Sequence, residues 1–228
     1  MLLKNNIGIA VNYLLERGAK VPTDVLVLAH RGMKQGGLYQ NVANALWTAV
    51  YDAVYDYLYQ KTLAVTGPRT RMRIAVSEAY QETAYIAYTD GGGEWPPDAE
   101  TEQWINSETA AQLSYVDSAF QTLRDLRKEG DFEAIHEAFI RADRWSWALD
   151  GFYNAVKMAG AKGKLLTWSL GQTEKHCQTC ATLDGQRHRA SWYRSRDYYP
   201  KKPGAAMECG GYRCDCELSD DKGEVFSL

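Results

Sequence analysis

The first 176 residues of this 228-residue chain contain no cysteine. The chain also has no uninterrupted run of 18 apolar residues, which is close to the minimum for a membrane-spanning helix, so we expect no such helix. Polar residues interrupt the start, Met1 to Asn6, where a secretory signal peptide would be apolar. The charge is too balanced for a disordered chain, at −3 overall. We therefore expect a folded, soluble protein made in a reducing cytosol.

All five cysteines lie in the last 52 residues, and an odd number gathered at one end is atypical of a secreted disulfide scaffold. They are Cys177, Cys180, Cys209, Cys214 and Cys216. The first two form a C-x-x-C hook, which places two thiolates on one side of a tight turn. Structural zinc sites take four Cys or His ligands in a tetrahedron. The sequence therefore predicts a structural Zn²⁺ site made by four of the five cysteines.

The spacing of the cysteines favours three of them as ligands and leaves two competing for the fourth position. The favoured ligands are Cys177, Cys180 and Cys214, and the competitors are Cys209 and Cys216, one of which is spare. Gly210-Gly211 gives the backbone the freedom to turn around a metal ion. Bound zinc would contribute on the order of 10 kcal/mol to the folding of this segment.

Residues 1–163 are predicted to be helical. Apolar residues recur at steps of three and four over 38–63, 69–88, 99–129 and 131–160, which is typical of helices with one buried face. Gly91-Gly92-Gly93 and Pro96-Pro97 interrupt the pattern and predict a flexible connector at about 90–98. The predicted fold class is mainly α, an elongated helical region with a small β-rich, zinc-stapled module at 164–228.

The pattern within that module changes after Gly163. Leu165 to Leu170 is a short strand-like run that leads into the cysteines. Leu183-Asp184-Gly185-Gln186 is typical of a hairpin turn, because Asp-Gly tolerates the positive φ that such turns need. We expect a strand, a cysteine turn, a hairpin, a loop and a second cysteine turn that ends at Glu217-Leu218.

Charge is distributed unevenly along the chain. Residues 90–150 contain five basic and fourteen acidic residues, a net charge of −9. Such a surface repels nucleic acid and suits a basic protein partner, although a merely solvated helical face would have the same composition. Both interpretations stay open at this point.

Residues 185–216 show the opposite charge balance, with seven Lys or Arg against three acids. The basic residues are Arg187, Arg189, Arg194, Arg196, Lys201, Lys202 and Arg213, with His188 among them. Four aromatic residues are interspersed: Trp192, Tyr193, Tyr198 and Tyr199. They are either stacking platforms for DNA bound by the basic 187–202 loop or aromatic residues that pack around a metal site.

No complete catalytic motif is found, so we predict no enzyme activity and name no catalytic or cofactor-binding residue. A zinc deaminase needs His-x-Glu before its cysteines, whereas His136 and Glu137 are adjacent. The same pair lacks the second histidine of a zincin, because Ile140 stands in that place. A metal-dependent nuclease would have to use His176 or His188 beside the cysteines.

The C-terminal module resembles that of a family of phage proteins. The features that carry the resemblance are the Thr-Trp strand at 167–168, the C-x-x-C hook, Leu-Asp-Gly, Arg-His-Arg-Ala-Ser-Trp, Pro-Gly, and Glu-Cys-Gly-Gly-Tyr-Arg-Cys-Asp-Cys-Glu-Leu at 208–218. Together they are similar to the ending of tailed-bacteriophage minor head, or head morphogenesis, proteins related to the Mu F protein. That family usually ends in a His-Pro-x-Cys-x-Cys-like segment, so the residue that replaces the histidine here is open.

This resemblance implies a virion protein present in few copies. Its expected place is the capsid interior near the portal, after assembly in the host cytoplasm, and its expected partners are portal and capsid proteins. Its expected role is head morphogenesis and DNA packaging or ejection, with no enzyme activity in the module. The alternative from another class is a zinc-ribbon nucleic-acid-binding protein, with an HNH-like nuclease as one form of it.

Overall fold

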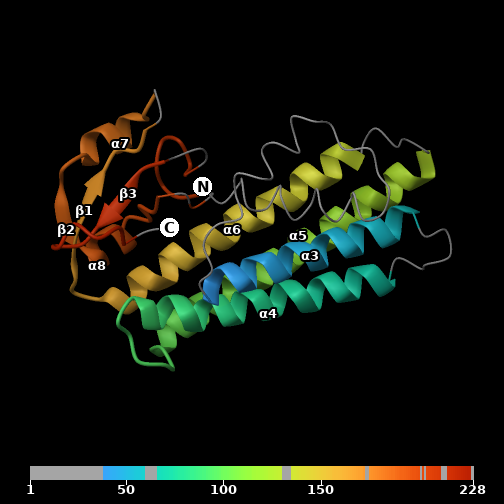
Figure 1. Cartoon of the computed structure of the whole chain (residues 1–228), viewed down its shortest axis with the longest axis horizontal. Coiled ribbons are helices and arrows are strands. Elements are labelled where there is room, and N and C mark those ends of the chain that lie inside the picture. The colour runs from blue at the N-terminus through green and yellow to red at the C-terminus, as the bar shows by residue number, and fades with distance from the viewer. Residues whose placement is uncertain are drawn as a thin grey trace. The chain divides into compact units, whose positions relative to one another are not determined.

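The computed structural model describes residues 38–59, 66–129, 135–172, 175–200, 202, 204–211 and 215–226. The described part of the chain is mainly helical with a small sheet (Figure 1), and it has a cysteine cluster near the C-terminus, as the sequence predicted. The long helices are α3 (Leu38–Tyr59), α4 (Thr66–Asp90), α5 (Ala99–Glu129) and α6 (Ile135–Ala161). None of the described helices is long and apolar enough to cross a membrane.

Contacts divide the chain into two compact units. One contains the described residues of 1–80 with 108–146, and the other contains 81–107 with 147–228. Helices α4, α5 and α6 each contribute residues to both units. The predicted domain boundary near Gly163 and the flexibility of 90–98 stay predictions; residues 91–98 lie between α4 and α5.

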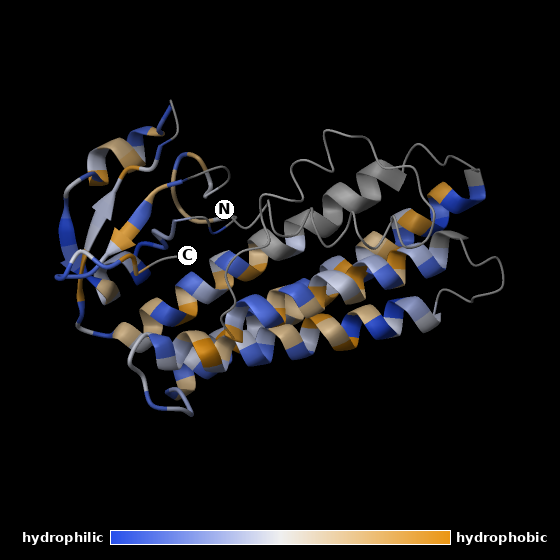
Figure 2. Cartoon of the chain, viewed as in Figure 1, coloured by the Kyte–Doolittle hydropathy of each residue, from blue (hydrophilic) through white to orange (hydrophobic). Residues whose placement is uncertain are grey.

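The core of the first unit is built from apolar stripes on its helices, and Figure 2 shows hydrophobic and hydrophilic residues interspersed along them. The buried residues of α3 follow the predicted spacing; they include Val42, Leu46, Val50, Ala53 and Val54. Tyr51, on the same helix, is also buried, and it stacks on Trp47 with ring centroids 4.7 Å apart. The α3 stripe is therefore core packing in this structure.

An ion-pair group links α4 to α5 in the same unit. The Arg73 guanidinium lies 2.6 Å from one carboxylate oxygen of Asp117, and that of Arg69 lies 2.8 Å from the other. Asp117 belongs to the acidic middle of the chain, so this part of the acidic segment is used inside the protein rather than left to a partner.

The second unit brings the C-terminal ends of α4 and α6 close together. A Cβ atom added to Gly160 would collide with the carbonyl oxygen of Tyr88, so only glycine allows this approach. Near this contact, the Tyr153 hydroxyl donates a hydrogen bond of 2.5 Å to a carboxylate oxygen of Asp90.

A three-stranded antiparallel sheet is formed within the described part of this unit. Its strands are β1 (Leu165–Ser169), β2 (Arg187–Arg189) and β3 (Glu217–Ser219), in the order β2-β1-β3. The register places Leu166 opposite His188, and Trp168 opposite Leu218. Two short helices, α7 (Gln178–Leu183) and α8 (Ala190–Arg194), precede and follow β2.

The predicted hairpin at Asp184-Gly185 is wrong in one respect. Gly185 does have a positive φ of 70°, as the sequence indicated. However, the turn connects helix α7 to strand β2 and does not join two strands. The partner of β2 is β1, which lies before the first cysteine hook.

The sheet, the short helices and the last turns of α6 share one hydrophobic core. Its buried members are Ala155, Met158, Ala161, Leu166, Trp168, Cys180, Leu183, Ala190, Tyr193, Tyr199, Ala205, Met207, Cys216, Leu218 and Phe226. The Tyr193 hydroxyl is close to two backbone carbonyl oxygens, those of Leu166 (3.3 Å) and Gln186 (3.1 Å). Phe226 closes the core, because its N–H donates to the carbonyl of Leu218 and its ring is buried.

Candidate metal centre

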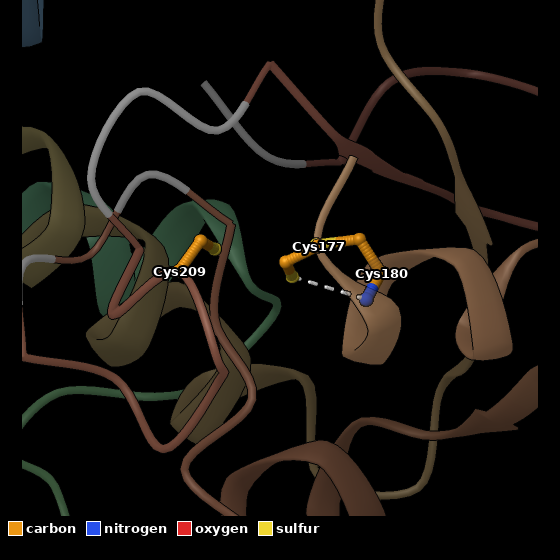
Figure 3. Close-up of side chains that lie close together, drawn as sticks. All are labelled: Cys177, Cys180 and Cys209. Carbon is orange, nitrogen blue, oxygen red and sulfur yellow. Dashed lines mark hydrogen bonds between the residues drawn. The ribbon is translucent and has the colours of Figure 1, made fainter. Parts of the chain in front are cut away.

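The first cysteine hook is formed by the N-terminal turn of α7. Cys177 is the N-cap residue, in extended conformation, and Cys180 lies one turn into the helix. The Cys180 backbone N–H donates to the Cys177 sulfur at 3.4 Å, shown as the dashed line in Figure 3. A helix N-terminus has N–H groups without helical partners, and here a sulfur accepts from one of them. This cap places both cysteine side chains at the same end of the helix.

Cys209 lies in the loop of residues 204–211, which we call the second hook. Gly210 and Gly211, which the sequence indicated as a turn, have positive φ values of 59° and 73°. A Cβ atom at Gly211 would collide with the carbonyl oxygen of Lys202, so glycine is also required there by space. The Gly204 N–H donates to the carbonyl of Gly210 at 2.9 Å and closes the loop. This turn presents Cys209 toward the first hook (Figure 3).

The two hooks bring three thiol groups together. The sulfur atoms of Cys177, Cys180 and Cys209 all lie within 4.8 Å of one another, with Cys180 buried and the other two half-buried. In a tetrahedral site with Zn–S bonds of about 2.3 Å, two sulfur atoms are about 3.8 Å apart. A contraction of about 1 Å or less would bring these sulfurs to that spacing. The three residues are thus close enough to hold a metal ion.

Glu208 joins the two hooks through two hydrogen bonds. Its carboxylate accepts from the backbone N–H of Gln178 at 2.6 Å, and its own N–H donates to the Thr179 hydroxyl at 3.2 Å. Gln178 and Thr179 are the two residues between the cysteines of the first hook. The residue before Cys209 is therefore tied directly to the turn that holds Cys177 and Cys180.

The surroundings of Cys177 favour its thiolate form. Partial burial opposes ionisation, but hydrogen bonds from Cys180 and Cys209 outweigh it and lower the pKa of the Cys177 thiol below its ordinary value. The thiolate is the form that ligates metal ions. The site is therefore electrostatically suited to a cation.

The other two predicted ligands have different positions. Cys216 is 1% exposed and lies in the apolar core, outside the group of three thiols. Cys214 lies outside the described residues. Of the two competitors for the fourth position, the structure thus brings Cys209 to the first hook and places Cys216 in the core.

The aromatic residues of the basic segment differ in burial. Tyr193 and Tyr199 are buried in the core, so they are not stacking platforms. Trp192 is half-buried and stacks on His188, with ring centroids 3.6 Å apart and planes 11° apart. Among the bases, Arg194 pairs with Glu100, at a distance of 3.5 Å.

Lys202 is the other paired base among the described residues of this segment, 2.7 Å from a carboxylate oxygen of Asp197. Lys201 and Arg213 lie outside the described residues. The exposed bases that remain for a ligand on the described surface are Arg187, Arg189 and Arg196.

The histidines do not join the thiol group in the part of the chain that the structure describes. His188 contacts the Gln186 side chain, with Nε2 3.0 Å from Oε1, and stacks on Trp192. His176 precedes the first hook and is half-buried. His30 and the His136 side chain lie outside the described residues. A nuclease site built from a histidine beside the cysteines therefore has no support in the described residues.

Sequence reasoning missed Glu208. An acidic residue next to a cysteine carries no signal by itself, and its partner N–H is 30 positions earlier in the chain. The only hint was that the first turn of a helix has N–H groups to satisfy, and α7 was not expected to be a helix.

No family model, no curated protein and no solved structure matches this chain.

Proposed function

We propose that the C-terminal module holds a structural Zn²⁺ ion. The observation that supports this is that the sulfur atoms of Cys177, Cys180 and Cys209, which come from two separate hooks, lie within 4.8 Å of one another. Thiolates suit a borderline-soft divalent ion and exclude Mg²⁺ and Ca²⁺, which prefer oxygen. The bound ion would lock the second hook to α7 and hence to the sheet.

Cys214 is the fourth ligand in this proposal, and Cys216 is the spare thiol. The spacing Cys209-x4-Cys214 leaves room for a turn that returns to the same ion. Cys216 directly precedes β3, whose pairing with β1 fixes its position, and its sulfur is not in the group of three that lie within 4.8 Å of one another. Four thiolates close the coordination shell, which is the arrangement of structural rather than catalytic zinc sites.

Metal analysis of the purified full chain tests the site. We expect one equivalent of zinc in the wild-type protein and in Cys216→Ala, but a large loss in Cys209→Ala. Both variants remove one thiol, so Cys216→Ala is the matched control. Less than about half an equivalent of zinc or iron in the wild type, with folding intact in chelator, would contradict the proposal.

We propose further that the protein acts in the head of a tailed bacteriophage. In this role it is a minor head protein of the capsid interior, associated with the portal, and it serves head morphogenesis and DNA packaging or ejection. One observation supports this role. The two cysteine hooks and the Thr-Trp strand, on which the resemblance to that family rests, belong to one module with a shared core. The long helices offer surface for contact with other subunits.

Co-expression with the portal and capsid proteins of the same locus tests this role. We expect the chain to co-purify with the portal protein and to be recovered in assembled heads at low copy number. An unrelated protein expressed at the same level serves as the control for trapping. The proposal is contradicted if the folded, metal-loaded chain stays unassociated.

A further inference from the structure

A shallow depression of about 510 Å³ lies beside β2 and α8, away from the group of three thiols. It is lined by Leu165, Arg187, His188, Arg189, Ser191, Trp192 and Ser195. Its volume falls in the range of about 300–1,000 Å³ that small-ligand sites occupy. All of its lining residues belong to one compact unit. The depression is therefore a property of the C-terminal module itself.

The depression carries positive charge that is not neutralised within the described part of the chain. Arg187 and Arg189 are exposed residues of β2, which is an edge strand of the sheet. Neither forms an ion pair with a described acid; Arg189 donates to the carbonyl oxygen of Gly163 at 3.3 Å. Arg196, close by on the chain, bonds only to oxygens of Trp192 and Ser195 among the described residues. An anionic ligand would therefore be attracted here.

The wall of the depression is a fixed aromatic pair. His188 and Trp192 stack at 3.6 Å, and the Arg196 guanidinium lies 4.1 Å from the centre of the same indole ring. The rings of Tyr193 and Tyr198 pack edge-on against Trp192, at 5.1 and 6.0 Å. These contacts cover the Trp192 indole and hold the His188 ring against it, so a flat ligand would stack on the imidazole of His188, which lines the depression, without ordering that side chain first.

We propose that this depression binds a nucleotide unit with an unpaired base. The base packs against the His188–Trp192 pair, and Arg187 and Arg189 hold its phosphates. A purely acidic peptide would use the arginines but not the aromatic wall. In a duplex the bases are stacked on one another and cannot pack in this way. The unit comes either from a single strand or from a free nucleotide, and the inference does not depend on the role in phage heads.

Fluorescence anisotropy of a fluorescein-labelled oligothymidylate with the full, metal-loaded chain tests the site. We expect the single strand to bind more tightly than a duplex of the same length. Affinity should fall with salt, and Arg187→Gln should lower both the affinity and the salt slope, by about 0.7 for each phosphate that the variant no longer binds. Lys222→Gln removes the same charge from another exposed position of the module and should change neither.

The aromatic wall is tested separately from the charges. His188→Ala should weaken single-strand binding by between about fivefold and a hundredfold, the usual effect of losing one stacking partner, with the salt slope unchanged. His188→Phe keeps a flat ring and should restore most of the affinity. Circular dichroism and zinc content serve as folding controls for each variant.

Competition experiments identify the source of the nucleotide. Displacement of the strand by thymidine monophosphate at a similar nucleotide concentration supports a free nucleotide, and failure to displace it supports a single strand. Three results would overturn the proposal: no binding of either ligand, a duplex that binds as tightly as the strand, or polyglutamate that competes as well as the strand does.

Discussion

At the scale of single residues, Glu208 contributes to the metal centre by linking its two hooks, a role that its place in the sequence does not indicate. Its carboxylate caps the N-terminal turn of α7, while its N–H reaches the Thr179 hydroxyl. Both bonds join the hooks through groups other than the thiols. They help to hold the loop that contains Cys209 against the first hook, which reduces the cost of ordering that loop on binding.

Replacing Glu208 by alanine should weaken metal binding while leaving the ligands in place. Residues that orient ligands from outside the coordination shell typically contribute a factor of about 10 to 100 in affinity. We expect a loss of this size for Glu208→Ala in a competition titration with a chromophoric chelator. Glu224→Ala, at another exposed acid of the module, should titrate like the wild type. Equal affinities for Glu208→Ala and the wild type would mean that the link does not position the thiols.

The cysteines themselves could be predicted from the sequence as a metal group, because C-x-x-C spacing brings two thiols together locally. Which of the other three cysteines lies next to the first hook could not be predicted. Whether Cys209 or Cys216 meets the first hook depends on the pairing of β3 with β1, which is a contact between residues about 50 positions apart. Local spacing carries no information about such a contact.

At the scale of elements, the close approach of α4 and α6 depends on the missing side chains of Gly160 and of Gly91, which directly follows α4. Gly160 faces the carbonyl of Tyr88 with no room for a Cβ atom. A larger residue must push the helices apart, because neither backbone can yield locally. Such overpacking typically costs about 1–3 kcal/mol or more.

Gly160→Val should therefore lower the free energy of unfolding by at least about 1–3 kcal/mol, as measured by urea denaturation followed by circular dichroism. Ala111→Val is the matched control, since it introduces the same side chain at an exposed position of α5. There only the lower helix propensity of valine acts, which should cost less than about 0.7 kcal/mol. If Gly160→Val lost no more stability than Ala111→Val, the helices would not be held at this distance.

The long helices were predictable because their apolar residues repeat over several turns. On α6, Leu149, Phe152 and Val156 are buried as their spacing predicts. Helices α7 and α8 are only six and five residues long, too short for a periodic signal. Strand β2, Arg-His-Arg, is polar throughout and is held by its ladder with β1 rather than by any preference of its residues.

At the scale of the whole molecule, the charges of the acidic residues determine how stability changes with pH. Burial raises the pKa of Asp117, but its hydrogen bonds with Arg73 and Arg69 outweigh that effect and hold the pKa below its ordinary value. Backbone hydrogen bonding to Thr101 does the same for Asp98. The unfolded chain therefore binds more protons than the folded one at low pH.

Stability should fall as the pH drops below about 4, the ordinary pKa of a carboxyl group, and continue to fall through the lower pKa values of the folded state. Because Asp117 is partly exposed, its share is about 1 kcal/mol or less. Urea denaturation at a series of pH values, with a chelator present so that metal release does not contribute, measures the effect. Asp117→Asn should be less stable near neutral pH and show a shallower loss in acid. An unchanged acid slope in this variant would show that the Arg69–Asp117–Arg73 group does not stabilise the fold.

The distance along the chain between the two hooks also has a consequence for synthesis. Cys180 leaves the ribosome 29 residues before Cys209. At about 5–20 residues per second, the first two thiols wait roughly 1.5–6 s for the third. Phe226, which closes the core, follows later still. During that interval the exposed sulfurs depend on cellular reductants to stay unoxidised, so expression under oxidising conditions should yield protein that is damaged before it is complete.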